Sequence, residues 1–493
     1  MNVKLRIEYR TTYGENLYVV TENGPKKGHP MHYIGGDLWE CTLKPTSEEL
    51  VYHYELRNSE RTLRTEWGAP HHLILDGKMT TLHIYDRWQQ MPADRSFRST
   101  MFTEGVFARV KRAKQQPIGA GEVVIRAEIA QVRSDEQVIL VGDAKQLGQW
   151  EVKKGIEMSD ADFPVWSAHL KADKLQLPFM YKFVIVKRTT GEVVSWELGE
   201  NNYFAQPVPS KGSVLIDALR PRFNRPAWRG AGVAIPVFAL RSEQSFGVGE
   251  FYDLKLMVDW AASTGQSIIQ ILPVNDTTMT NTWQDSYPYN ANSTFALHPQ
   301  FLRLEEVGEL NDKAEMERYR QLGKELNALT QIDYERVNEA KRAYLWAIYR
   351  QEGKKTFRTK AFKEFMATNS HWLRPYAVFC ALRDAFSTPD FNTWGKWSKY
   401  TAAKAAKYEE EHPEEVAFNH FVQFHLDRQL RAVRDYAHSK GVVLKGDIPI
   451  GISRTSVDAW ANPELFNMDS SAGAPPDDFS VMGQNWGFPT YNW

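Results

Sequence analysis

The hydrophobic pattern of this chain changes once, after Pro226, and this change constrains the fold more than any other feature. Before it, apolar and polar residues alternate in short runs such as Met1–Arg10, separated by turns rich in Gly and Pro. A period of two predicts half-buried strands, and therefore an all-β N-terminal part. After it, near-continuous apolar runs at Gly232–Leu240, Ser267–Val274 and Val442–Ile450 are typical of strands buried on both faces in parallel β/α construction.

The all-β part repeats its own outline. Asp37–Leu43 resembles Pro164–Leu170, and Val51–Leu56 resembles Met180–Ile185. An internal repeat of this kind predicts two β-sandwiches of one type in tandem, which we place at residues 1–90 and 121–220. A polar, linker-like stretch at about 91–120 would join them. The tryptophans inside the repeated strands, Trp39 and Trp166, are expected in the two cores.

Between the second and third buried runs, residues of helical periodicity extend from about Lys313 to Lys440, and Gly441 is placed to end the last helix. The chain supplies about three strands of the barrel type, whereas a (β/α)8 barrel needs eight. The predicted fold is therefore multidomain. Two all-β sandwiches precede the N-terminal part of a (β/α)8 TIM barrel at 228–493, which is incomplete and carries a helical insertion at about 313–440.

Charge and aromatic content favour a neutral ligand. Sixty basic and 61 acidic residues give a net charge of −1, so neither nucleic acid nor an anionic membrane is an expected partner. Aromatic residues make up 13% of the chain and include 16 Trp, more than core packing alone requires. Flat amphipathic rings can stack on sugar faces while the sugar hydroxyls stay hydrated.

Two features predict a cytoplasmic protein. Cys41 and Cys380 are far apart and offer neither a disulfide framework nor a thiolate metal site, which fits a reducing compartment. The N-terminus is typical of a strand rather than a signal peptide, and no run of about 18 apolar residues could span a membrane.

The second β segment contains a set of residues suited to holding a sugar. Trp150 ends a Gly turn, and Trp196 precedes a polar turn that contains Asn201. Lys182 lies between apolar neighbours on an alternating strand, so it points away from the core. These residues resemble the starch-binding module at the C-terminus of fungal glucoamylases. The resemblance implies that both Trp stack on neighbouring glucose units and that Lys182 and Asn201 bind hydroxyls; the alternative is that the rings belong to the core.

The first β segment departs from this pattern. It lacks the Gly-x-Trp loop, and His53 stands where the lysine would be. Its ring candidates are Trp67 and Tyr33, so a sugar site there would be built differently. The pair His71-His72 could suggest a metal, but adjacent side chains rarely chelate alone, and a solvated turn is expected.

After Trp228, a series of motifs follows in one order: Gly232–Leu240, Ser245–Glu250, Ile271–Asp276, Asp285–Tyr289, Gly446–Gly451, Val457–Pro463, Gly473–Ser480 and Gly483–Tyr491. Together they resemble the amylomaltase family of 4-α-glucanotransferases. Many amylomaltases have an aromatic residue where this chain has Asp478. An Asp there, behind tandem starch-binding modules, resembles the plant cytosolic disproportionating-enzyme type and its bacterial relatives.

The resemblance assigns substrate-binding residues to the barrel segment. Asp447 directly follows a buried strand, where barrel active sites form, and would hydrogen-bond the sugar at the bond that is cut. Tyr289 would stack on the same sugar. Residues of the loop near the end of the sequence would shape the acceptor and oligosaccharide sites. The full substrate-binding set is Asp447, Tyr289, Asp285, Phe479, Gln484 and Trp486.

Retaining transfer needs a carboxylate nucleophile and an acid/base carboxyl group about 5 Å apart. The resemblance places both beyond Trp493, so no catalytic residue is assigned within the chain, and it implies no metal or organic cofactor. The expected function of the intact protein is transfer of α-1,4-glucan segments, with starch, glycogen, maltose and malto-oligosaccharides as partners. A non-catalytic starch- or glycogen-binding fragment and an α-glucan hydrolase of the same clan stay open as alternatives.

Overall fold

The alternating runs of the N-terminal part form eighteen strands in the computed structural model, which describes residues 1–25, 27–109 and 112–493. The first nine are β1 (Asn2–Glu8), β2 (Asn16–Thr21), β3 (His29–Pro30), β4 (His32–Gly35), β5 (Leu38–Leu43), β6 (Glu49–Arg57), β7 (Thr62–Thr65), β8 (His71–Ile74) and β9 (Thr81–Arg87). The next nine are β10 (Glu122–Glu128), β11 (Glu136–Gly142), β12 (Ile156–Glu157), β13 (Ser159–Asp162), β14 (Val165–Lys171), β15 (Phe179–Lys187), β16 (Val193–Trp196), β17 (Asn202–Phe204) and β18 (Gly212–Leu219). We call β1–β9 the first module and β10–β18 the second.

The two modules have matching strand pairings. In the first, β1 pairs antiparallel with β5 and parallel with β9; in the second, β10 pairs antiparallel with β14 and parallel with β18. The buried indoles correspond as well. Trp39 Nε1 donates to the carbonyl oxygen of Tyr9 at 3.1 Å, and Trp166 Nε1 donates to that of Ile129 at 3.0 Å. Both tryptophans are buried, which confirms their predicted place in the core.

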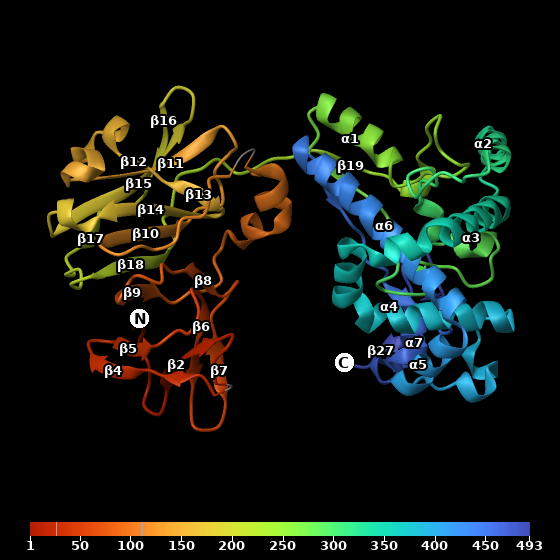
Figure 1. Ribbon diagram of the computed structural model, residues 1–493, viewed down its shortest axis with the longest axis horizontal. Helices are drawn as coiled ribbons and strands as arrows, with labels where there is room; N and C mark the ends of the chain where they lie inside the picture. Colours follow the sequence, from red (N-terminus) through yellow and green to blue (C-terminus); the bar gives the residue numbers. More distant parts are fainter. Residues whose placement is uncertain (26, 110–111) are drawn as a thin grey trace. The chain divides into compact units, whose positions relative to one another are not determined.

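The modules are joined through a continuous sheet. Strand β9 of the first module pairs in parallel with β18 of the second, from Thr81 opposite Gly212 to Tyr85 opposite Ile216 (Figure 1). The resulting eight-stranded sheet has the order β13-β14-β10-β18-β9-β1-β5-β4. Val124 and Leu215 of the second module are buried in the core of the first. The chain accordingly divides into two compact units, Met1–Arg229 and Gly230–Trp493. The sandwich limits given from the sequence stay a prediction.

The stretch predicted as a polar linker is in part a packed element. A helical turn at Met101–Val106 buries Phe102, and both Phe102 and Phe107 belong to the core of the second module. Arg109 is buried and donates from Nε to Asp160 Oδ2 at 2.8 Å. Apolar residues four to five apart within a charged stretch were the overlooked signal. Residues 110–111 of this stretch lie outside the described residues.

The C-terminal unit contains a parallel three-stranded sheet in the order β19-β20-β22. These strands, β19 (Gly232–Ala234), β20 (Ile268–Gln270) and β22 (Val443–Lys445), are shorter than the apolar runs that predicted them. Each run contains a proline a few residues after the strand ends, at Pro236, Pro273 and Pro449. Proline has no N–H to donate to a sheet, which explains why pairing does not continue through the runs.

Helices occupy the rest of this unit. They are α1 (Asp253–Ser263), α2 (Lys313–Asn327), α3 (Tyr334–Arg358), α4 (Lys360–Phe386), α5 (Ala402–Glu411), α6 (Pro413–Ser439) and α7 (Val457–Ala461). Gly441 adopts a φ of 72° just past α6, as expected for a glycine that ends a helix. Short pairs complete the unit: β21 (Asn290–Ala291) with β23 (Gly451–Ile452), β24 (Phe466–Asn467) with β27 (Thr490–Tyr491), and β25 (Gly473–Ala474) with β26 (Gln484–Asn485). Among the described residues, no helix combines the length and apolarity needed to cross a membrane.

Candidate functional site

Tyr289 and Asp447 lie together at the carboxyl ends of the parallel strands. Asp447 follows β22 by two residues, and Tyr289 directly precedes β21. Strands β21 and β23 pair in parallel, with Asn290 opposite Gly451, and this pairing brings the two loops side by side. The Tyr289 hydroxyl donates to Asp447 Oδ2 at 2.8 Å. This hydrogen bond raises the pKa of Tyr289, because it favours the neutral phenol beside a carboxylate.

A second aromatic residue adjoins this pair. The Tyr287 ring lies 5.7 Å from that of Tyr289 between centroids, and 55% of Tyr287 is exposed. Tyr287 was not predicted as a site residue. The two tyrosines on either side of Pro288 were the sequence signal that could have indicated a paired aromatic surface. The two rings and Asp447 provide an open aromatic surface next to a hydrogen-bond acceptor, which is an arrangement that can hold a sugar ring.

The Asp285 carboxylate forms its hydrogen bonds within its own loop. Its buried carboxylate accepts hydrogen bonds from the backbone N–H groups of Met279 at 3.0 Å, Thr280 at 2.9 Å and Asn281 at 2.7 Å. The Thr280 hydroxyl is a fourth donor, at 3.0 Å. The carboxylate therefore fixes the shape of the loop that leads to Tyr289, and direct contact with a sugar stays a prediction.

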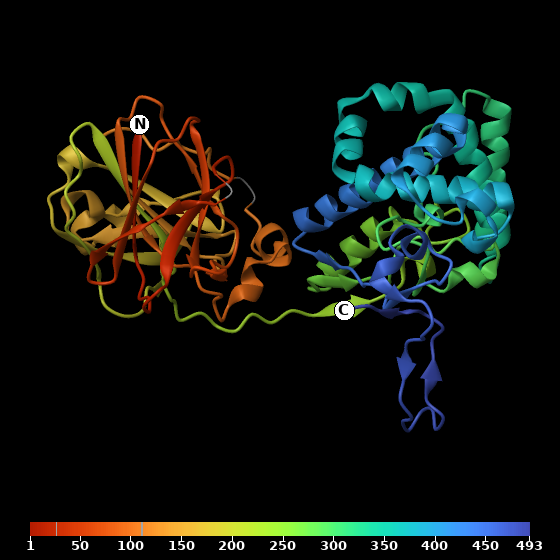
Figure 2. The ribbon, with the colours of Figure 1, turned by 90° about the horizontal axis from the view of Figure 1, so that it is seen from below.

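Phe479, Gln484 and Trp486 belong to the β25–β26 hairpin, which projects from the C-terminal unit (dark blue in Figure 2). Phe479 near its tip is 96% exposed. Trp486 Nε1 donates to Gln484 Oε1 at 2.9 Å and is 39% exposed. The described structure gives neither Phe479 nor Trp486 a contact with Tyr289 or Asp447, so these loop residues are not gathered at the same point.

The four predicted starch-binding residues gather around one face of β15. Met180, Lys182 and Val184 alternate onto that face. Trp196 stands opposite Val184 in the β15–β16 register, and Trp150 packs against the small apolar cluster that contains Val184. Asn201 Nδ2 lies 4.0 Å from Met180 Sδ. The face therefore carries two partly exposed indoles with an amine and an amide between and beside them.

Lys182 also holds the loop that carries Trp196. Its Nζ donates to the carbonyl oxygen of Glu197 at 3.1 Å and to that of Gly199 at 2.6 Å. An ammonium group has three donors, so one N–H is left for a ligand. Trp196 is 39% exposed. Trp150 is half-buried, and its own φ is 68° at the end of the turn Lys145–Trp150.

Among its described residues, the first module presents no equivalent face. His53, in the lysine position, contacts Glu55 Oε1 through Nε2 at 3.1 Å. Trp67 is half-buried under the guanidinium of Arg220, 5.7 Å from the ring centroid. Tyr33 is 56% exposed and packs edge-on against Trp39.

The expectation of a solvated turn is wrong for His71, which is buried in β8 where the two modules meet. Its Nδ1 lies 3.1 Å from Asp217 Oδ2, and its Nε2 lies 3.2 Å from Glu66 Oε2. Burial alone would lower the pKa of His71, but Asp86, Asp217 and Glu66 together raise it well above its usual value. His71, Asp86 and Asp217 could offer a metal three ligand atoms within 4.8 Å of one another. Both ring nitrogens already contact carboxylates, so His71 is held as an imidazolium and has no free nitrogen for a metal.

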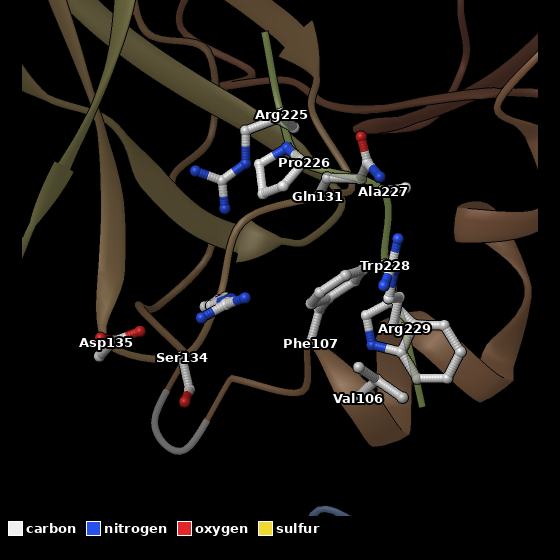
Figure 3. A pocket seen from close by; sticks show the side chains of 11 residues that line it. Val106, Phe107, Gln131, Ser134, Asp135, Arg225, Pro226, Ala227, Trp228 and Arg229 are labelled. Atoms are coloured by element: carbon white, nitrogen blue, oxygen red, sulfur yellow. The ribbon is translucent and has the colours of Figure 1, made fainter. Parts of the chain in front are cut away.

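A separate pocket of about 400 Å³ lies in the N-terminal unit (Figure 3). Arg225, Trp228 and Arg229 line it from the segment after β18, together with Phe107 and Ser134. None of the predicted sugar-binding residues lies in it. It therefore adds nothing to the two predicted sugar-binding sites described above.

Comparison with known proteins defines the class of each part. A model of the starch-binding domain matches residues 122–215, and a model described as 4-alpha-glucanotransferase, glycoside hydrolase family 77, matches residues 235–493. The second match covers more than half of the chain. The chain belongs to the 4-alpha-glucanotransferase family, with a starch-binding domain ahead of the family region.

Relatives of known function agree with this membership. The chain is 36% identical to 4-alpha-glucanotransferase DPE2 of Oryza sativa subsp. japonica, over 99% of this chain and 54% of the rice protein. It is 35% identical to the 4-alpha-glucanotransferase of Chlamydia muridarum, over 53% of this chain and 49% of that protein. An amylomaltase from Streptococcus agalactiae in complex with acarbose aligns with a TM-score of 0.47 at 26% identity, over 54% of each chain. The chain spans about half the length of the curated relatives it matches.

Proposed function

We propose that this chain is the glucan-holding part of a 4-α-glucanotransferase that moves α-1,4-glucan segments between starch, glycogen, maltose and malto-oligosaccharides. The observation that carries the proposal is the hydrogen bond from Tyr289 to Asp447 at the carboxyl ends of β20 and β22. In a family 77 region, an aromatic ring beside a carboxylate at this edge suits the sugar whose bond is cut. Asp447 would accept hydrogen bonds from hydroxyls, and Tyr289 would stack on the ring.

The chemistry would follow the retaining route. A carboxylate nucleophile forms a covalent glycosyl-enzyme, and the acid/base carboxyl group first protonates the leaving oxygen and then activates the 4-hydroxyl of the acceptor. The Arg-Ile-Asp-His type of segment that the resemblance assigns to the nucleophile does not occur in residues 1–493. We therefore assign the bond-breaking step to no residue of 1–493.

The β-modules would deliver substrate. A glucan held on Trp150 and Trp196 is kept near the barrel, which raises its effective concentration there. The first module is proposed as a second starch-binding module of the same origin, since its pairings match those of the second. A cytoplasmic site of action fits a chain whose two cysteines are buried and unpaired.

The proposal is tested by incubating the full-length protein with maltose and glycogen. We expect glucose release from maltose together with lengthening of glycogen chains, and no net gain of reducing ends. A net gain of reducing ends would indicate a hydrolase instead, and no turnover by the full-length protein would contradict the proposal.

The second candidate, a non-catalytic glucan-binding protein, is favoured for residues 1–493 on their own because the nucleophile segment does not occur in them. We expect this chain to bind soluble starch without releasing glucose from maltose. Turnover by the chain alone would exclude that candidate.

A further inference from the structure

A long groove runs beside the pairing that joins the two modules. It has a volume of about 980 Å³ and is lined by residues of both modules. The first module contributes mainly the ends of β1 and β9 with the residues that follow them, and the second contributes mainly β17 and its flanks. This volume lies at the upper end of the range of about 300–1,000 Å³ that is usual for ligand sites. Neither module alone could form it.

Aromatic rings line the groove. Tyr9 and Trp88 follow β1 and β9, which are neighbours in the sheet, and their ring centroids lie 4.5 Å apart with a tilt of 45°. Both rings are half-buried. From the second module, Tyr203 enters the groove on the outward side of β17 and is 65% exposed. Partly exposed rings contributed by both modules can provide stacking surfaces for a sugar chain.

Free hydrogen-bond donors accompany the rings. Among the described residues, the guanidinium groups of Arg10, Arg64 and Arg87 form neither a hydrogen bond nor an ion pair, and all three line the groove. Asn201 also lines it, and its only described partner is the Met180 sulfur. Such donors complement the oxygen acceptors of sugar hydroxyls. The lining also contains the carboxylates of Glu8 and Asp37, which offset part of the positive charge and favour a neutral polyol over an anion.

The groove and the indole face of the second module share one residue, Asn201. Asn201 lies at both, because β17 pairs with β15 next to Met180 and Tyr181. Residues of β15 alternate between the two sides: Lys182 lies on the indole face, whereas Tyr181 lines the groove.

We propose that this groove binds a segment of α-1,4-glucan several glucosyl units long, as a second glucan site that exists only where the two modules are joined. The proposal rests on the proposed function, since it takes its ligand class from it. Tyr9, Trp88 and Tyr203 provide the stacking surfaces, and Arg87 and Asn201 donate to hydroxyls. The groove is distinct from the site on Trp150 and Trp196, and Asn201 lies beside both.

The test is isothermal titration of the 493-residue chain with maltoheptaose. Four variants are compared with the unmodified chain: Trp88→Ala and Tyr203→Ala in the groove, Trp196→Ala on the indole face, and Trp260→Ala as a control. Trp260 is 46% exposed on α1 in the C-terminal unit, far in sequence from both surfaces. Tyr203→Ala guards against a folding artefact, because the Tyr203 side chain is mostly exposed.

We expect the unmodified chain and Trp260→Ala to bind more than one maltoheptaose. Trp88→Ala and Tyr203→Ala should each weaken one class of sites about tenfold, a loss of about 1.4 kcal/mol. Trp196→Ala should weaken the other class and leave the groove class intact. If both groove variants titrate like the unmodified chain while Trp196→Ala abolishes binding, the groove proposal is overturned and the proposed function stands. If the folded, unmodified chain binds no maltoheptaose, the proposed function itself fails.

Discussion

Tyr289 and Asp447 are 158 residues apart in the sequence and meet through two short segments that pair in parallel. The position of Asp447 could be predicted, because a polar residue directly after a buried parallel strand lies at the carboxyl edge of the sheet. The position of Tyr289 came from family resemblance alone. Their hydrogen bond depends on the β21–β23 pairing. Strands of two residues are too short to produce a recognisable pattern in the sequence, so this pairing could not be predicted.

Replacing Asp447 should change the ionisation of Tyr289. In Asp447→Asn the phenol loses its carboxylate acceptor, so we expect the pKa of Tyr289 to fall toward its usual value of about 10. The difference in tyrosinate absorbance between variant and unmodified chain during a pH titration measures this shift. Asp477→Asn, on the exposed hairpin with no described tyrosine contact, is the control. Identical titrations of Asp447→Asn and the unmodified chain would show that the two side chains do not interact.

At the scale of elements, the sequence predicted which segments are strands and helices better than where they end. The apolar runs of the C-terminal unit contain their strands, but Pro236, Pro273 and Pro449 shorten each one. The repeat predicted two matching modules, and their pairings do match. Pairing between β9 and β18 was not predictable, because each strand carries the pattern of an ordinary half-buried strand and nothing in either identifies the partner.

One prediction at this scale concerns the packing of α3 within the C-terminal unit. Lys341 is fully buried and donates to Glu250 Oε1 at 2.5 Å and to the carbonyl oxygens of Gln300 and Leu302 at 2.6 and 2.8 Å. Lys341→Met leaves three buried acceptors without this donor, and we expect a loss of about 3–5 kcal/mol in the unfolding free energy of the unit. Arg336→Met on the same helix removes an exposed pair with Glu325 and should leave stability unchanged. Urea denaturation followed by fluorescence compares the two; equal midpoints would contradict the prediction.

A second prediction at this scale concerns the junction of β8, β9 and β18. Burial raises the pKa of Asp86 to about 6, against about 3.9 in an unfolded chain, although His71 opposes the shift. The folded state therefore holds a proton that the unfolded state releases between pH 4 and 6, so this contribution to stability is lost as the pH rises through 6. The raised pKa of His71 acts in the same direction above pH 6.5. Asp217, whose pKa is lowered, contributes stability that is lost only in acid.

We therefore expect the N-terminal unit to be most stable near pH 5 and to weaken toward pH 8. Asp86→Asn cannot ionise, so its stability should fall less between pH 5 and 7 than that of the unmodified chain. Denaturant midpoints of the two proteins at a series of pH values test this. Parallel pH profiles would mean that Asp86 is already ionised at pH 5.

At the scale of the whole molecule, one chain contains a starch-binding domain followed by a 4-alpha-glucanotransferase region. The order of parts and the family could be predicted from motifs, because Trp150, Lys182, Trp196 and Asn201 mark the starch-binding segment and the series from Gly232–Leu240 to Gly483–Tyr491 follows it. The shared sheet and the groove beside it could not, since they arise from contacts between residues such as Tyr9 and Tyr203 that belong to different modules. The loop-fixing role of Asp285 likewise required the structure.

We propose above that Trp150 and Trp196 hold α-glucan on the face of β15. Affinity electrophoresis of the 493-residue chain through gels containing soluble starch tests it most directly, with Trp260→Ala as the control. We predict strong retardation of the unmodified chain and of the control, and affinity at least about tenfold weaker in the double variant Trp150→Ala, Trp196→Ala, a loss of about 1.4 kcal/mol. Equal retardation of the double variant and the unmodified chain would contradict the claim.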